Sequence, residues 1–442
     1  MEEKYLTRFN EWWISGKVRN ELTQIFVRSE YRIAEELLTD RRITIIYGLR
    51  RVGKTTIMYQ LISSLLQKNT DSRHVLYFSF DDLSANLEDV LNCYFEKILN
   101  TPVLEARDVY IFLDEIQKVK DWENKLKIYY DLYPGLKFTV SGSSSLNTSR
   151  RSAETLAGRF FKLRIDPLTF RDFLKLKGYD IPLDKLQLSG EILKPLFFEY
   201  LKKGGFPELV NETNQWKISE YVKSLVLDRI IAIDIPQEFG IRDVQLLRKL
   251  VDIFFYNPGM IVNLDKLSSA LGRNRLTISN FISFLEYSFM IRLISNFRPA
   301  NLATSRKLKK VYPYNSAFIY ALSSTGYDEL FPYVLEVAAQ ISLSTDMYFR
   351  DGSTEVDFIK KLDDNLIAVE VKSGNIDYNV IANSFKKLNL DSGIILNMDI
   401  FGEEKRNGVN LFLYPIWAFT LYPYEILKQF IEKHHDRKQT NV

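Results

Sequence analysis

The chain has 442 residues, 46% hydrophobic and 26% charged, with a net charge of +3. These proportions exclude a disordered or fibrous protein, and the length predicts about three domains. One cysteine, Cys93, and three histidines without Cys or His partners at metal-ligand spacing argue against disulfides and a structural zinc site.

The first ten residues are polar and lack the apolar core of a signal peptide, which predicts a cytoplasmic protein. The longest uncharged run, 407–424, contains Pro415, Pro423 and several tyrosines. Buried strands explain this run better than a membrane-spanning helix, so we expect no contact with a membrane.

The first motif joins a β-branched strand at 43–47 to a glycine-containing loop and then to a helical pattern. The loop has the spacing G-x4-G-K-[ST], in which backbone N–H groups and the helix N-terminus face a polyphosphate. Lys54 would neutralise the β and γ oxygens, and Thr55 would ligate magnesium. The expected nucleotide-binding residues are Gly48, Leu49, Arg50, Arg51, Val52, Gly53, Lys54, Thr55 and Thr56.

A second predicted strand, 109–113, ends in Asp114 and Glu115. Ligands bind at the C-terminal edge of such sheets, where both carboxylates would lie. We expect Asp114 to hold hydrated magnesium and Glu115 to polarise the water that attacks ATP.

A third predicted strand, 137–140, precedes a run of small hydroxyl residues. Either Ser141 or Ser143 would sense the γ-phosphate, or the run is a plain turn. Arg159 is open to two interpretations: an arginine finger supplied to a second copy of the chain in a homo-oligomer, or an ordinary surface or core-pairing arginine.

These motifs resemble the AAA-type ATP-binding proteins of archaea and bacteria that carry a C-terminal domain of unknown function. The resemblance rests on GLRRVGKTT, IFLDEIQKVKDWENKLK, VSGSSS and LAGRFFKLRIDPLTFRDFL, and continues through GGFPELV. It implies an ATPase of the AAA class in residues 1–170, with ATP and Mg²⁺ as cofactors.

Two segments of different character follow the motifs. Residues 171–240 read as amphipathic helices and predict a lid or connector. Residues 241–325 fit three helices with a turn at Gly272–Asn274, which predicts a winged-helix domain. Its recognition helix would begin near Arg275, with Arg273 and Asn274 beside it, and 297–314 would form the wing.

Charge is concentrated in this middle segment. Residues 241–320 hold twelve Lys and Arg against four acids, a net +8, while the remainder is −5. Such an excess favours DNA as a partner, with the wing lysines Lys307, Lys309 and Lys310 on the phosphate backbone. A solvated charged face, an acidic neighbour within the chain, or a protein-docking module are the alternatives.

The last segment, 326–442, is predicted to begin with a helix and continue through three strands. Asp357 lies in the second strand, and Glu370 and Lys372 share one face of the third. With Glu336 on the helix, these carboxylates would form a hard oxygen site for magnesium, and Lys372 would orient water or stabilise charge during phosphodiester cleavage.

The carboxylate pattern resembles the PD-(D/E)xK nuclease core, and nuclease-like C-terminal domains occur in the wider group named above. Here Val356–Asp357 replaces the usual proline–aspartate step. An inactive core that is kept for binding is therefore the alternative to a nuclease.

The sequence thus predicts an α/β protein with three functional hypotheses. The first is a Mg-dependent ATPase coupled to DNA binding or processing, with or without nuclease activity. The second is a nucleotide-dependent switch or scaffold with an inert C-terminal site. The third is a nucleotide-gated defence effector.

Overall fold

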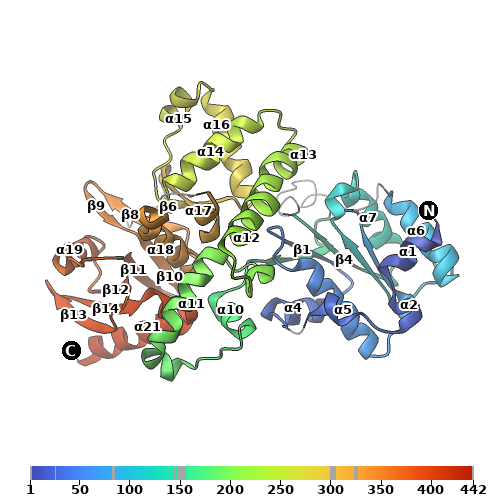
Figure 1. The fold of residues 1–442 in the computed structure, drawn as a ribbon, viewed down its shortest axis with the longest axis horizontal. Coiled ribbons are helices and arrows are strands. Elements are labelled where there is room, and N and C mark those ends of the chain that lie inside the picture. The colour runs from blue at the N-terminus through green and yellow to red at the C-terminus, as the bar shows by residue number, and fades with distance from the viewer. Residues whose placement is uncertain are drawn as a thin grey trace. The chain divides into compact units, whose positions relative to one another are not determined.

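The computed structural model describes residues 2–24, 26–81, 85–143, 146, 156–298, 305–322 and 327–440. At 305–308, 327 and 435–440 the description covers the backbone only. The chain forms two compact units, Met1–Pro167 and Leu168–Val442, which are described separately below (Figure 1).

The first unit contains a five-stranded parallel sheet in the order β2-β3-β4-β1-β5. Strands β1 to β4 are largely apolar and are buried almost throughout, as expected for a parallel sheet, whereas the edge strand β5 is mostly half-buried. The strands are β1 (Ile43–Gly48), β2 (Val75–Ser79), β3 (Val109–Asp114), β4 (Leu136–Gly142) and β5 (Phe160–Ile165).

Helices connect and flank these strands, and α5 follows β1 directly through the glycine-containing loop. A π-helix, Tyr94–Leu99, continues α6. The α-helices are α1 (Glu3–Phe9), α2 (Trp12–Ser15), α3 (Asn20–Thr23), α4 (Ser29–Leu37), α5 (Lys54–Gln67), α6 (Leu87–Cys93) and α7 (Trp122–Leu132).

Close approach of strands β1 and β5 explains why glycine ends β1. A Cβ atom at Gly48 would lie 2.1 Å from the carbonyl oxygen of Ile165, so no other residue fits without moving β5. At the other end of the loop, Gly53 has a φ of 95° and is the N-cap of α5. Glycine adopts this conformation without the steric cost that a Cβ brings.

The second unit begins with the helices expected between 171 and 240. Thr169 and Asp172 form a capping box at the start of α10. The elements are α10 (Phe170–Leu176), α11 (Gly190–Lys203), α12 (Gln215–Glu220), the π-helices Tyr221–Leu227 and Ile230–Asp234, and α13 (Ile235–Phe239).

Three helices and an antiparallel hairpin come next, where the sequence analysis expected three helices and a wing at 297–314. The helices are α14 (Val244–Tyr256), α15 (Leu264–Leu271) and α16 (Arg275–Tyr287), and the hairpin is β6 (Ile291–Asn296) and β7 (Ser305–Pro313). Side chains of Asp243, Asn263 and Asn274 accept backbone N–H bonds at the three helix starts. Such caps satisfy donors that have no partner within the helix.

The remaining elements form two sheets, ordered β7-β6-β8-β9 and β10-β11-β12-β14-β13. Because β6 pairs in parallel with β8, one sheet contains strands from both 241–325 and 326–442. The elements are α17 (Ser316–Leu322), α18 (Tyr327–Leu343), β8 (Met347–Asp351), β9 (Thr354–Val356), β10 (Phe358–Leu362), β11 (Asn365–Val371), α19 (Tyr378–Lys387), β12 (Ser392–Asn397), β13 (Gly402–Arg406), β14 (Val409–Pro415), α20 (Ile416–Leu421) and α21 (Pro423–Thr440).

Two local predictions need correction. The strand expected around Asp357 is interrupted at that residue: β9 ends before it and joins one sheet, while β10 begins after it and joins the other. The uncharged run 407–424 is not made of strands alone, because the buried helix α20 follows β14. Within the described part of the chain, no helix combines the length and apolar character needed to cross a bilayer.

Candidate functional sites

The phosphate-binding loop joins β1 to α5 at the C-terminal edge of the first sheet. Lys54 is 6% exposed, and its Nζ donates to the carbonyl oxygens of Gly48 at 3.2 Å and Leu49 at 2.9 Å. These bonds fold the ammonium group back over the loop. The first N–H groups of the 14-residue helix α5 face the same loop, so the site concentrates positive charge for an anion.

Arg28 anchors this loop and was not predicted. It is 6% exposed, and its guanidinium donates to the carbonyl oxygens of Val52 at 2.8 Å and Asp166 at 2.7 Å. It also pairs with Glu30 at 2.8 Å. The loop is thereby held to the segment that follows β5. Arginine is common outside such sites, so its sequence position carried no signal.

Asp114 accepts hydrogen bonds from three hydroxyl groups. Thr55 Oγ1 donates to Oδ2 at 2.7 Å, and the Tyr77 hydroxyl donates to the same oxygen at 3.0 Å. Ser141 Oγ donates to Oδ1. Asp114 and Thr55, both expected to serve magnesium, are therefore brought together, and Ser141 contacts this carboxylate. Ser143 is buried one residue beyond the end of β4.

Glu115 follows Asp114 in a left-handed conformation, with φ of 54°. The Gln117 side chain donates to its Oε2 at 2.5 Å, a contact that the sequence analysis did not predict. Removal from water and, more weakly, the neighbouring Asp114 raise the pKa of Glu115, while Lys54 and Arg50 oppose the rise. A carboxylate with a raised pKa is a stronger base for a water proton.

Arg159 lies at the opposite edge of the same sheet. Its carbonyl oxygen accepts a 2.8 Å bond from the N–H of Ile43, the first residue of β1, whereas the phosphate-binding loop follows the last residue of that strand. The guanidinium is paired with both oxygens of Asp131 at 2.8 and 3.2 Å. Action on a second copy of the chain stays a prediction.

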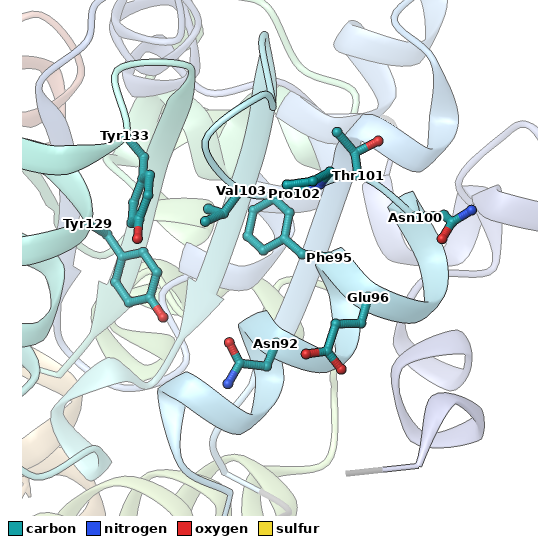
Figure 2. Close-up of a pocket in the computed structure, with 9 residues that line it drawn as sticks. All are labelled: Asn92, Phe95, Glu96, Asn100, Thr101, Pro102, Val103, Tyr129 and Tyr133. Carbon is teal, nitrogen blue, oxygen red and sulfur yellow. The ribbon is translucent and has the colours of Figure 1, made fainter.

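A pocket of about 460 Å³ also lies away from the phosphate-binding loop (Figure 2). Phe95 and Glu96 of the π-helix line it together with Tyr129 and Tyr133 at the end of α7. Val103, another lining residue, precedes β3 and so belongs to the edge where strands begin. The pocket is therefore separate from the candidate nucleotide site.

The second unit contains the predicted carboxylate cluster. The N–H of Asp357 donates to Glu370 Oε2 at 3.3 Å, and the N–H of Val371 donates to Asp357 Oδ2 at 2.9 Å. Lys372 Nζ donates to Glu370 Oε1 at 2.6 Å. The bend at Asp357 and strand β11 are thus locked together by their own side chains, with Glu370 only 9% exposed.

Glu336 joins this cluster from α18 and is held by the hairpin strand β7. The Tyr312 hydroxyl donates to Glu336 Oε2 at 2.9 Å. Burial first, and then the charge of Asp357, raise the pKa of Glu336 to about 8. The same two causes raise the pKa of Glu370 to about 7. Like charges in a desolvated site disfavour the ionised forms.

The donor chemistry of this cluster fits magnesium, since carboxylate oxygens are its preferred protein ligands. Among the described residues, however, no three Asp, Glu, His or Cys side chains are arranged to hold a metal ion as they stand. Glu370 instead directs one oxygen at Lys372.

Lys310 does not belong to a DNA-facing wing, which corrects the sequence prediction. It is 4% exposed, its Nζ pairs with Glu355, and its charge lowers the pKa of Glu336. A buried lysine needs such a partner, so the carboxylates of the second unit account for its position. The side chain of Lys307 lies outside the described residues, and Lys309 is half-buried.

Two other basic residues of 241–320, Arg273 and Arg275, are exposed but paired. Arg273 contacts Asp243 at 2.8 Å, and Arg275 contacts Asp265 at 3.4 Å. Both arginines stand at the start of α16, where the recognition helix was expected. The local charge excess is therefore partly balanced within the unit.

Two family models match separate parts of the chain. Residues 40–174 match the model of an AAA domain, and residues 194–329 match a domain of unknown function (DUF8612). The first unit thus contains an AAA-type P-loop domain with a parallel sheet. The winged-helix and nuclease-like folds that were expected from the sequence stay predictions.

Three relatives carry the description "uncharacterized protein". One from Haemophilus influenzae is 26% identical over 344 residues, covering 74% of this chain and 82% of its own. Two from Methanocaldococcus jannaschii are each 27% identical. The alignments cover 66% of this chain and 65% of the relative in one case, and 62% and 58% in the other.

Solved structures resemble the chain only loosely. The Walker-type ATPase of Pyrococcus abyssi has 15% identity and a TM-score of 0.40, over 69% of this chain and 97% of its own. The Orc1 protein of Aeropyrum pernix, in complex with DNA, has 14% identity and a TM-score of 0.33, over 73% and 98%. These scores are too low to support an argument about function.

The raised pKa of Glu336 predicts how stability depends on pH. Between pH 4.5, the ordinary pKa of glutamate, and about pH 8, the Glu336 carboxyl keeps its proton in the folded protein but loses it in the unfolded chain. The unfolded chain then binds fewer protons, so stability falls as pH rises through this window. We expect Glu336→Gln to reduce that fall, measured as the melting temperature from about pH 5 to about pH 8.

Glu329→Gln serves as the control, because Glu329 is an exposed glutamate on the same helix. It is expected to leave the pH profile of the wild type unchanged. An identical slope in Glu336→Gln and the wild type would contradict burial as the cause of the raised pKa.

Proposed function

We propose that the protein is a Mg-dependent ATPase whose AAA domain binds and hydrolyses ATP. The observation that carries this proposal is the meeting of Lys54, Thr55, Asp114 and Glu115 at one edge of the parallel sheet. Thr55 Oγ1 donates to Asp114 Oδ2 at 2.7 Å, and the backbone N–H of Glu115 donates to Asp114 Oδ1 at 3.1 Å. Lys54 Nζ donates to the carbonyl oxygen of Gly48 in the adjoining loop at 3.2 Å. Such an edge is where α/β sheets bind ligands.

Thr55 and Asp114 fit the ion that accompanies ATP. Their hydroxyl and carboxylate oxygens are hard donors 2.7 Å apart, beside the loop that would hold the phosphates. When bound, magnesium would neutralise charge on the β- and γ-phosphates. The N–H groups of the loop and α5 orient the phosphate chain, and Lys54 exchanges its carbonyl partners for phosphate oxygens.

Glu115 is proposed to orient the attacking water and to take its proton. Burial raises the pKa of its carboxyl, which strengthens it as a base, and Gln117 fixes its direction through the 2.5 Å bond. Gln117 is therefore a positioning residue for Glu115.

Two substitutions separate binding from hydrolysis. Lys54→Ala is expected to abolish turnover and to weaken ATP binding at least about 10-fold, because it removes a cation that contacts phosphate. Glu115→Gln is expected to keep ATP bound while slowing turnover about 100-fold or more. Nucleotide affinity and phosphate release measure the two effects.

Lys68→Ala, at the far end of the same helix, is the matched control and is expected to behave as the wild type. Normal turnover by Glu115→Gln would remove Glu115 from the proposed role.

DNA is the partner that we propose for the helices α14–α16 and the hairpin that follows them. Their order is that of a winged helix, and exposed Arg273 and Arg275 stand at the start of α16, where such domains contact phosphates and base edges. Docking of a protein on the same helix is the alternative.

We expect the double substitution Arg273→Ala and Arg275→Ala to weaken duplex binding by the full-length protein. The salt dependence should lose about one unit of slope per arginine, because fewer counterions are released. Lys223→Ala, at an exposed lysine of the π-helix Tyr221–Leu227 and outside α14–α16, is the control. No binding by the wild type even at low salt would favour the protein-docking alternative.

The carboxylate cluster suggests a second candidate function, metal-dependent cleavage of phosphodiester bonds. Glu336, Asp357, Glu370 and Lys372 come from three separate stretches of the sequence and gather in one largely buried site. In this proposal Glu336, Asp357 and Glu370 would hold the ion, which would polarise the phosphate, and Lys372 would stabilise the charge that develops on it. An inert core retained for binding is the alternative.

Cleavage of plasmid DNA with Mg²⁺ or Mn²⁺ tests this function. Asp357→Ala and Lys372→Ala are each expected to abolish nicking while ATP hydrolysis persists, because the two sites belong to different units. Asp364→Ala, an exposed aspartate in the turn after β10, is the control. Cleavage that survives in both variants would point to a contaminant or another site.

A further inference from the structure

The N-terminal segment Glu3–Ser15 covers the outer edge of β2. Asn10 is fully buried, and its carboxamide pairs with both backbone groups of Tyr77: the Tyr77 N–H donates to Oδ1 at 2.6 Å, and Nδ2 donates to the Tyr77 carbonyl at 2.8 Å. Nδ2 also donates to the carbonyl of Leu6 at 2.7 Å. The side chain thus replaces the peptide group of a neighbouring strand.

Two tryptophans complete the cover of this edge. The indole N–H groups of Trp12 and Trp13 donate to the carbonyl oxygen of Val75 at 3.0 and 2.9 Å. Edge strands expose backbone groups that otherwise pair with water or with another chain. Here the outward groups of Val75 and Tyr77 are satisfied by one short segment, so the position of β2 depends on it.

Tyr77 links the N-terminal segment to the candidate nucleotide site, because its backbone pairs with Asn10 and its side chain contacts Asp114. Its ring is buried, and the centroid of the ring lies 4.7 Å from the ring centroid of Tyr59. Its hydroxyl donates to Asp114 Oδ2 at 3.0 Å. The Tyr77 hydroxyl is thus one of the donors that orient the carboxylate of Asp114.

We propose that Asn10 and Tyr77 are positioning residues of the ATPase, through which the N-terminal segment sets the carboxylate of Asp114 for Mg·ATP. The inference rests on the proposed ATP hydrolysis. Partners that orient a metal-binding carboxylate typically contribute 10-fold to 100-fold to metal affinity. Tyr77 and Thr55 both donate a hydrogen bond to Oδ2 of Asp114. When the Tyr77 hydroxyl is removed, Thr55 is the one of these two donors that remains.

The test is a magnesium titration of ATP hydrolysis by full-length protein. Tyr77→Phe keeps the ring and removes only the hydroxyl; it is expected to raise the half-saturating Mg²⁺ concentration about 10-fold. ATP affinity without magnesium should stay that of the wild type. Asn10→Ala is expected to shift the magnesium requirement in the same direction, because β2 loses its outer partner.

Tyr94→Phe is the matched control. Tyr94 is fully buried in the same unit, and its hydroxyl donates to the Arg73 carbonyl at 2.6 Å rather than to Asp114. Its magnesium requirement should equal that of the wild type. Thermal unfolding without nucleotide separates loss of fold from loss of positioning in each variant.

The outcomes distinguish this inference from the function on which it rests. A wild type that hydrolyses ATP, with an unchanged magnesium requirement in a folded Tyr77→Phe protein, overturns the inference and leaves the ATPase intact. A wild type that neither binds nor hydrolyses ATP overturns both. A shift in Tyr77→Phe and Asn10→Ala, but not in Tyr94→Phe, supports the proposal.

Discussion

The carboxylate of Asp114 is the point on which the first unit depends, because three elements direct hydroxyl groups at it. Thr55 comes from α5, Tyr77 from β2 and Ser141 from β4. A carboxylate that is 4% exposed needs such partners to offset its loss of water. The parallel register places the ends of β2, β3 and β4 side by side, so the sheet itself brings the donors together.

Burial of charge has a different outcome in the second unit. Glu336 and Glu370 interact unfavourably with Asp357 in a desolvated cluster, and their pKa values rise to about 8 and about 7. Lys310 and Lys372 offset part of that repulsion, and Tyr312 holds Glu336. The hairpin strand β7 therefore contributes to the cluster, and its partner β6 pairs with β8 from the other side of residue 325.

Local sequence motifs predicted much of the two candidate sites. The glycine spacing and the strand that ends in Asp114 predicted a nucleotide site, and the structure brings Thr55 and Asp114 together there. The two-residue spacing of Glu370 and Lys372 predicted that they share one face, and Lys372 Nζ contacts Glu370. The contacts of Arg28 and Asn10 depend on segments far apart in sequence, for which single residues give no pattern. The Gln117–Glu115 contact is local, but it depends on the left-handed turn at Glu115, which no glycine marks in the sequence. Lys310 was misplaced because charge counts do not distinguish a solvated lysine from one buried against Glu355. The break at Asp357 arises from a switch between sheets, which alternation along one strand does not reveal.

The most direct test of the account is a crystal structure of the wild-type protein with Mg²⁺ and a non-hydrolysable ATP analogue. The account predicts phosphates within the loop 48–55, with the ion beside Thr55 and Asp114 and the γ-phosphate facing Glu115. Nucleotide bound elsewhere, or an ion that leaves Thr55 and Asp114 without contact, would contradict it.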